Sequence, residues 1–240
     1  MAQALNFDRA LIEKYDRPGP RYTSYPTAPQ FHQAFAVDDY RAAAQASNQV
    51  AQPKPLSLYI HIPFCQSLCY YCACNKIITQ KTHRAVEYLT YLKREIAMQA
   101  ALFDKSRKLT QLHFGGGTPT YLTSEQLAEV MDCLHQAFNL DDSDDHEFSI
   151  EVDPRTISRE RIAELRAQGF NRLSFGVQDF DAQVQAAVNR VQSEEQIYDL
   201  VAAAREARFK SVSVDLIYGL PLQTVASFDL TLSKIIALRP

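Results

Sequence analysis

The chain has 240 residues, of which 46% are hydrophobic and 22% are charged, which is enough for one large α/β domain or two smaller ones. A net charge of −3 gives no indication of binding to nucleic acid or to a membrane surface, and no apolar run approaches the length of a membrane span. The first residues do not resemble a signal peptide, so we expect a cytoplasmic protein with reduced thiols.

Residues 1–52 show little hydrophobic periodicity and are expected to form an N-terminal extension. The segment Pro18–Pro26 contains prolines and a glycine that disfavour any regular element. Residues 38–50 are rich in alanine and predict a short helix. From residue 53 onward the pattern changes to a regular alternation of strands and helices.

Five short apolar runs in residues 53–240 predict β-strands. Their nearly continuous hydrophobicity is typical of parallel strands that are buried on both faces. The five runs are Leu56–Pro63, Leu109–Phe114, Phe148–Val152, Arg172–Val177 and Ser211–Tyr218. Strands that alternate with helices in this way predict an α/β fold in which a parallel sheet curls into a barrel or forms an open layer.

Amphipathic patterns between these runs predict the helices. Residues 83–102 place four apolar side chains on one face, namely Val86, Leu89, Leu92 and Ile96. Thr123 with Gln126, and Ser193 with Gln196, are possible capping boxes at the starts of two further helices. Gly169 lies where a helix that begins near Ser158 should end.

Motifs rich in glycine, proline or polar residues follow every predicted strand. In a parallel β/α fold these positions share one edge of the sheet, where active sites gather. The coincidence favours an enzyme, although proline and glycine are also ordinary punctuation between strands and helices. The motifs are His61–Cys65, Gly115–Pro119, Glu151–Pro154, Gly176–Phe180 and Asp215–Pro221.

Four cysteines, Cys65, Cys69, Cys72 and Cys74, lie within ten residues after the first strand. The first three have C-x3-C-x2-C spacing, which lets one loop supply three thiolates to an iron–sulfur cubane and leaves the fourth iron open for a reactive ligand. A zinc site made by these cysteines, or with His61 in place of one, is the alternative. Structural zinc motifs usually pair two separated knuckles, and no second one follows here.

Taken together, the cysteine motif, Gly115–Pro119, Glu151–Pro154 and Gly176–Phe180 resemble the radical S-adenosylmethionine (SAM) enzymes. More narrowly, Gly19–Thr27 and the additional Cys74 resemble the oxygen-independent coproporphyrinogen III oxidase family. The resemblance implies a six-unit (β/α)6 barrel. Five of the six units are present, so we expect the chain to stop before the sixth strand and to lack the family's C-terminal domain.

The resemblance also implies cofactors and site residues. Cys65, Cys69 and Cys72 would bind a 4Fe–4S cluster, whose open iron would be chelated by SAM. The reduced cluster would then generate a 5′-deoxyadenosyl radical. One or two SAM molecules would contact a set of ten positions: Tyr59, Tyr71, Cys74, Gly116, Gly117, Thr118, Glu151, Gln178, Arg190 and Asp215. No side chain is assigned as a catalytic residue, and Arg21 is a candidate for substrate or cofactor binding.

In that family the radical converts two propionates of coproporphyrinogen III into vinyl groups, which gives protoporphyrinogen IX for haem biosynthesis. The implied partners are therefore this porphyrinogen and an electron donor such as a flavodoxin-type protein, with residues 1–52 covering the substrate or cofactor. A related haem chaperone, another radical enzyme and a zinc-stabilised binding module are the alternatives. Cys74 and the Arg21–Tyr25 segment argue against the haem chaperone, and the same segment argues against another radical enzyme.

Overall fold

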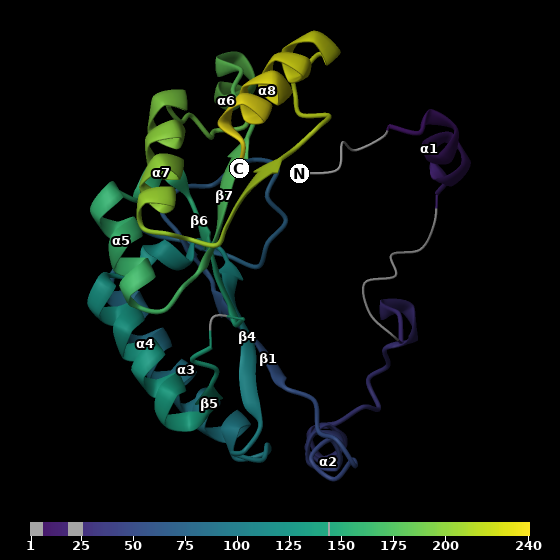
Figure 1. The fold of residues 1–240 in the computed structure, drawn as a ribbon, viewed down its shortest axis with the longest axis vertical. Coiled ribbons are helices and arrows are strands. Elements are labelled where there is room, and N and C mark those ends of the chain that lie inside the picture. Colours follow the sequence, from purple (N-terminus) through teal and green to yellow (C-terminus); the bar gives the residue numbers. More distant parts are fainter. Residues whose placement is uncertain (1–6, 19–25, 144) are drawn as a thin grey trace. The chain divides into compact units, whose positions relative to one another are not determined.

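The computed structural model describes residues 7–18, 26–143 and 145–240 (Figure 1). The chain divides into two compact units, Met1–Ala44 and Gln45–Pro240, whereas the sequence pattern placed the boundary between residues 52 and 53. Arg21 lies outside the described residues. Among the described residues, no helix combines the length and apolar character that a membrane crossing requires.

The first unit contains short elements. Helix α1 (Arg9–Tyr15) begins at Asp8, whose side chain accepts a hydrogen bond from the Leu11 amide, and a 3-10 turn, η1, spans Ala28–Gln30. Helix α2 (Val37–Ala46) crosses the boundary into the second unit and is shorter than the predicted 38–50. Two acidic residues in its first turn stabilise its positive end.

The second unit is built on one parallel sheet, and all five predicted strands are present. Its strands lie in the order β1-β4-β6-β7-β8, so neighbours in space are also successive long strands of the chain. A short strand, β5 (Asn139–Leu140), also pairs with β4 at its start. The five long strands are β1 (Leu56–Ile62), β4 (Lys108–Gly116), β6 (Glu147–Val152), β7 (Arg172–Gln178) and β8 (Ser211–Leu216).

Helices cover one face of this sheet, and Figure 1 shows α3, α4, α5 and α7 side by side along it. Helix α8 joins the row through the Tyr198 hydroxyl, which donates to the Lys234 carbonyl at 3.0 Å. The remaining elements are short and follow strand ends. The bounds are α3 His83–Ala100, η2 Pro119–Tyr121, α4 Ser124–Ala137, η3 Pro154–Thr156, α5 Arg159–Ala167, α6 Ala182–Ala187, α7 Glu194–Glu206 and α8 Val225–Leu238.

Most of the local signals in the sequence are confirmed. Thr123 and Gln126 form a reciprocal capping box, and α5 ends just before Gly169, whose φ of 99° suits glycine. The second proposed box is only half formed: Ser193 accepts from the Gln196 amide, but the Gln196 side chain donates to the Pro154 carbonyl. The Gln196 side chain therefore makes a tertiary contact with Pro154 in place of the hydrogen bond that would complete the capping box.

One predicted core position is wrong. Val86 is 58% exposed, and Ala85 is the residue of that turn that is fully buried. Leu89, Leu92 and Ile96 are buried as expected. The buried stripe of α3 therefore starts one residue earlier, at the small Ala85, than the pattern of large side chains predicted.

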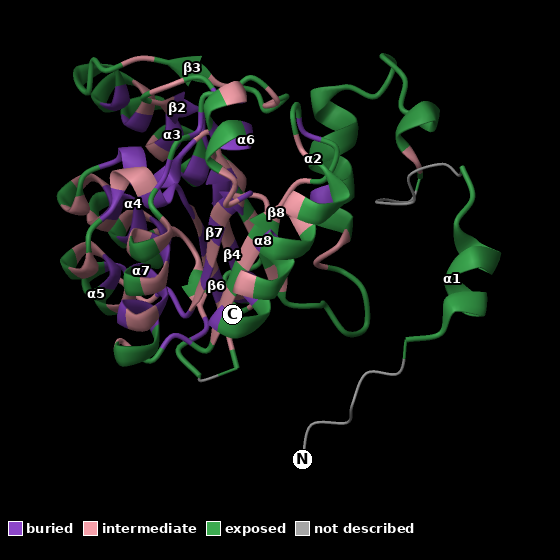
Figure 2. Cartoon of the chain, turned by 90° about the horizontal axis from the view of Figure 1, so that it is seen from above, coloured by how far each residue is buried: buried purple, intermediate pink, exposed green. Residues whose placement is uncertain are grey.

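The two faces of the sheet differ in composition. Side chains that point toward the helices are apolar and almost fully buried, for example Ile62, Phe114, Ile150 and Phe175, and Figure 2 shows the buried residues gathered between sheet and helices. The alternate residues point to the other face and are mostly polar: Tyr59, His61, His113, Ser149, Glu151, Ser174, Ser213 and Asp215. The expectation of strands buried on both faces is therefore wrong for this chain.

Candidate functional site: a cysteine loop above the strand ends

The cysteine loop leaves the sheet directly after β1. Two-residue strands β2 (Phe64–Cys65) and β3 (Ile77–Ile78) pair in parallel and hold the base of the loop. At the far side, the Tyr70 amide donates to the Val188 carbonyl at 3.0 Å, and Asn189 Nδ2 donates to the Leu68 carbonyl at 2.7 Å. The loop is thus fixed both at its base and against the turn after α6.

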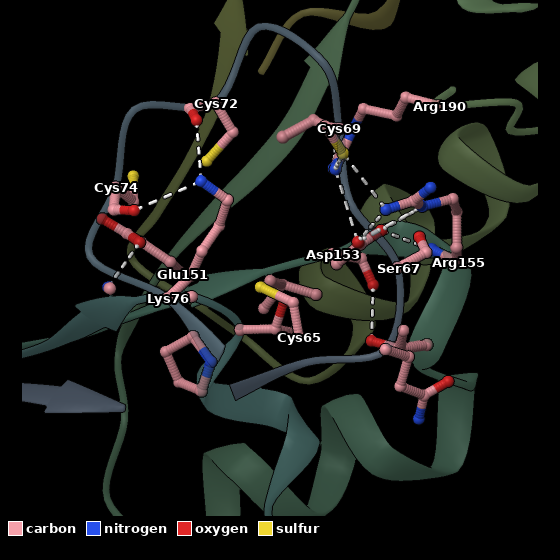
Figure 3. Close-up of a pocket in the computed structure, with 18 of the residues that line it drawn as sticks. Cys65, Ser67, Cys69, Cys72, Cys74, Lys76, Glu151, Asp153, Arg155 and Arg190 are labelled. Carbon is pink, nitrogen blue, oxygen red and sulfur yellow. Dashed lines mark hydrogen bonds and ion pairs between the residues drawn. The ribbon is translucent and has the colours of Figure 1, made fainter. Parts of the chain in front are cut away.

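The loop closes over a cavity of about 460 Å³ at the carboxyl ends of the strands. Figure 3 shows Cys65, Cys69 and Cys72 at three sides of it. Twelve of the thirteen predicted site residues line this cavity; Tyr59 is the exception. The twelve are Cys65, Cys69, Tyr71, Cys72, Cys74, Gly116, Gly117, Thr118, Glu151, Gln178, Arg190 and Asp215.

Tyr59 lies just outside the cavity wall, on the inner face of β1. Its ring stacks on His113 with 5.7 Å between centroids, and its hydroxyl lies 3.0 Å from His61 Nδ1. His61 Nε2 in turn lies 2.8 Å from the Asn75 carbonyl. Both ring nitrogens of His61 are therefore engaged, which disfavours the zinc alternative that used this residue.

Glu151 presents its carboxylate at the end of β6. Its Oε2 accepts the Gly116 amide at 3.2 Å, and its Oε1 lies 3.2 Å from His113 Nε2. His113 Nδ1 lies 2.6 Å from Ser149 Oγ, which orients the ring. A carboxylate has about four acceptor positions, so Glu151 can still accept hydrogen bonds from a ligand in the cavity.

The glycines after β4 are required by packing. A Cβ on Gly116, where φ is 117°, would lie 2.7 Å from the His61 ring. A Cβ on Gly117 would lie 2.8 Å from the Phe64 carbonyl oxygen, a backbone atom that cannot move aside. These glycines are therefore needed to let β4 pack against His61 and the start of the cysteine loop, apart from any contact with a cofactor.

Two arginines surround Cys69, which is 8% exposed. Arg190 Nη1 lies 3.4 Å and Arg155 Nη2 lies 3.6 Å from Cys69 Sγ. Asp153 binds both arginines, at 2.7 Å from Arg155 and 3.3 Å from Arg190. Arg190 itself is only 7% exposed, so it is not an ordinary surface charge.

The ionisable groups of this cluster influence one another. Burial by itself raises the pKa of Asp153, but the hydrogen bond from Arg155 and the charge of Arg190 outweigh it, so the pKa is lowered. For Arg155, burial by itself lowers the pKa, but the hydrogen bond and charge of Asp153 outweigh it and the pKa is raised. Asp153 and Arg155 are therefore both held in their charged forms.

The other cysteines have different surroundings. Burial raises the pKa of the Cys65 thiol, and a hydrogen bond from Thr118 Oγ1 at 3.5 Å partly offsets this. Burial and a hydrogen bond with Cys72 raise the pKa of the exposed Cys74. Lys76 Nζ donates to the Cys72 and Cys74 carbonyls at 2.7 and 3.3 Å, which fixes the turn between these residues.

The far wall of the cavity comes from β7 and β8. Gln178 has a φ of 66°, uncommon for a residue other than glycine, and Asp179 after it is buried and accepts a hydrogen bond from Thr231 Oγ1 at 2.8 Å. Asp215 belongs to an apolar strand, where an unpaired carboxylate would be costly, so the sequence predicts a buried partner or a ligand for it. It does accept a hydrogen bond from Ser174 Oγ at 3.0 Å, but it is exposed because it faces the polar side of the sheet.

Several residues of the cavity wall were not predicted as site residues, and three of them, Asp153, Arg155 and Lys76, are charged. Asp153 belongs to the Glu151–Pro154 motif but has no role assigned there, and its position two residues after Glu151 was the available signal. Arg155 and Lys76 had no comparable signal. Their contacts are to Cys69 and to loop carbonyls, which only the folded chain brings near.

The donor atoms present fit an iron–sulfur cluster. Three cysteine sulfurs of one loop face a single cavity, and thiolates are the usual ligands of such clusters. Within the described ranges, no three His, Cys, Asp or Glu side chains are grouped closely enough to hold one metal ion. The sulfurs lie around the cavity, as ligands to a larger group must.

Residues 59–235 match the model of the radical SAM superfamily, and the chain belongs to this superfamily. Membership implies a 4Fe–4S cluster and SAM as cofactors. The oxygen-independent coproporphyrinogen III oxidases of Pseudomonas aeruginosa and Escherichia coli are 48% and 50% identical to it over 240 and 238 residues, which is 100% and 99% of this chain. The chain spans about half of their length, 52% and 50%.

A solved structure of the coproporphyrinogen III oxidase from Escherichia coli, described as a radical SAM enzyme, superposes with a TM-score of 0.85 and 48% identity. It covers 99% of this chain and 52% of that protein's chain. The agreement confirms the predicted α/β class and the partial barrel.

Proposed function

We propose that the chain is the cofactor-binding part of an oxygen-independent coproporphyrinogen III oxidase. The observation that carries the proposal is the single cavity, which joins the three-cysteine loop to the ends of β4, β6, β7 and β8. The identity of about half of all positions with oxidases of that name supports the substrate class. The proposal gives the cavity three roles: binding of the cluster, binding of SAM and reaction with the substrate.

First, Cys65, Cys69 and Cys72 would hold the cluster, and the loop contacts to Val188 and Leu68 would keep their sulfurs in place. When bound, the cluster and SAM supply the one-electron chemistry that removes a hydrogen atom from the substrate. Because only three cysteine ligands are assigned, one iron is left for SAM.

Second, the strand ends would bind SAM. The Glu151 carboxylate, held by the Gly116 amide and His113, would accept hydrogen bonds from an amino or ribose hydroxyl group. The amides of Gly117 and Thr118 already donate to the Ile62 and Phe64 carbonyls, so these residues would offer carbonyl oxygens. The Tyr59 ring would lie beside Gly115. A second SAM would share Gly117 and Thr118 and would extend toward the opposite wall. Its further predicted contacts there are Tyr71, Cys74, Gln178, Arg190 and Asp215.

Third, the radical generated in the cavity would act on a propionate of the substrate, which loses a hydrogen atom, carbon dioxide and one electron to become a vinyl group. We place the reaction in haem biosynthesis in the cytoplasm, with a flavodoxin-type protein as electron donor and no nucleic-acid or membrane partner. The assignment of residues 1–52 as a covering segment belongs to the same proposal.

Anaerobic reconstitution with iron and sulfide, followed by dithionite, SAM and coproporphyrinogen III, tests the proposal. We expect 5′-deoxyadenosine together with protoporphyrinogen IX, and neither product from the Cys72→Ser variant. 5′-Deoxyadenosine without any change in the porphyrinogen would contradict the substrate assignment. Bound haem with no 5′-deoxyadenosine would favour the haem chaperone instead.

A further inference from the structure

The surroundings of Cys69 differ in charge from those of Cys65. Arg155 and Arg190 both bring a guanidinium N–H within 3.6 Å of Cys69 Sγ. Cys65 Sγ instead receives the neutral hydroxyl of Thr118 at 3.5 Å. Figure 3 shows the two arginines and Asp153 grouped on the Cys69 side, while Lys76 and Glu151 lie beside Cys72 and Cys74.

The group around Cys69 is not electrically balanced by itself. Two guanidinium charges face the single carboxylate of Asp153, which leaves one net positive charge at Cys69. The side chains of Arg190 and Asp153 are each only 9% exposed, so water screens this charge poorly. An unbalanced buried charge is costly, and a Cys69 thiolate that is bound to the cluster is the counter-charge that relieves it.

The geometry also fixes Arg155 where it is. Its Nε lies 3.0 Å from Asp153 Oδ1, its Nη2 lies 2.7 Å from Asp153 Oδ2, and its Nη1 lies 3.4 Å from the Asn189 carbonyl. Asn189 is the residue whose amide also holds the cysteine loop at Leu68. Arg155 therefore connects Asp153, the residue after β6, to Asn189, which is one of the residues that anchor the loop.

We propose that Arg155 is a positioning residue of the iron–sulfur centre that, with Arg190, donates N–H···S hydrogen bonds to Cys69 and raises the reduction potential of the cluster. The proposal rests on the assignment of Cys65, Cys69 and Cys72 as cluster ligands. Reduction adds one electron from dithionite to the oxidised cluster and moves no proton. Positive charge and hydrogen bonds at a ligand sulfur stabilise the more negative, reduced form more strongly.

Redox titrations followed by electron paramagnetic resonance test this on the reconstituted 240-residue chain. Arg155→Met removes the charge and the donors, and Arg155→Lys keeps the charge but loses the bidentate fork. We expect a midpoint potential that is most negative in Arg155→Met and intermediate in Arg155→Lys. Arg159→Met is the matched control, because Arg159 pairs with Asp199 and Glu206 outside the cavity and its removal should leave the potential unchanged.

Equal potentials in the parent and Arg155→Met would overturn the proposal, as would a shift of the same size in Arg159→Met. If Arg155→Met binds no cluster, the Arg155→Lys variant is titrated in its place. A midpoint potential below that of the parent supports the proposal, and a potential equal to that of the parent overturns it. A parent chain that binds no cluster at all would instead overturn the ligand assignment on which this inference rests. Iron analysis of the parent and of each variant shows whether a cluster is bound. It therefore separates a wrong ligand assignment from an unchanged reduction potential.

Discussion

The two faces of the central sheet are made by alternate residues of the same strands, yet one face stabilises the fold and the other forms the site. Phe175 points toward the helices and is fully buried, whereas its neighbours Ser174 and Gly176 line the cavity. The helix-facing side therefore supplies the hydrophobic stabilisation. The cavity side holds polar groups that pair with one another and face the site.

The largest expected effect comes from the helix-facing side. Phe175→Ala should lower the free energy of unfolding by about 3–5 kcal/mol, because it removes a buried ring and leaves a cavity. Urea unfolding followed by circular dichroism measures this. Ser174→Ala, one position away on the cavity side, is the control. It loses only the hydrogen bond to the exposed Asp215 and should change stability by about 1 kcal/mol or less. Equal losses in the two variants would remove the distinction between the faces.

Glu151→Gln should give the opposite pattern, with little loss of stability and weaker SAM binding. Loss of a charged acceptor costs about 1.5–3 kcal/mol, which is a decrease in affinity of tenfold or more. Anaerobic calorimetry on the reconstituted chain measures the affinity. The control is Glu147→Gln on the same strand and face, since Glu147 pairs with Arg172 and does not line the cavity. Equal weakening in both variants would refute the assigned contact.

A smaller effect concerns the pH dependence of stability. Because the pKa of Asp153 is lowered on folding, its carboxylate contributes stability above the unfolded value of about 3.9, and this is lost as pH falls through the folded pKa. The destabilisation caused by Asp153→Asn should therefore be larger at pH 6 than below about pH 3.

Thermal unfolding of Asp153→Asn and of the parent across this pH range measures the difference in stability between the two proteins. Asp132→Asn, which removes an exposed carboxylate on α4, is the control and should follow the parent at every pH. A difference between parent and Asp153→Asn that stays constant from pH 6 to pH 3 would show that the charge of Asp153 does not contribute.

The sequence predicts the strands, the caps and the cysteine loop well, because these depend on local patterns and on the specific chemistry of thiols. It also predicts that the strand ends meet at one edge, which follows from parallel topology. Arg155 escapes such reasoning. An arginine after a proline in a turn resembles a surface charge, and its contact with Cys69 joins residues 86 positions apart in sequence.

The burial of charged side chains was harder to predict. The apolar strand around Asp215 predicts a buried partner or a ligand for its carboxylate, but alternation and the position of β8 at the end of the sheet order leave that side chain exposed. Arg190 was predicted as a cofactor contact, and the buried carboxylate of Asp153 is what retains it inside. Burial of a charged side chain depends on its partner, which the sequence alone does not identify.

Iron and sulfide analysis after anaerobic reconstitution tests the central assignment most directly. The parent and Cys74→Ser should each bind about four irons per chain, and Cys65→Ser, Cys69→Ser and Cys72→Ser should bind clearly less. Visible absorption and electron paramagnetic resonance identify the cluster. One tightly bound zinc per chain without sulfide, or a loss of iron in Cys74→Ser as large as in Cys72→Ser, would contradict a cluster held by these three cysteines.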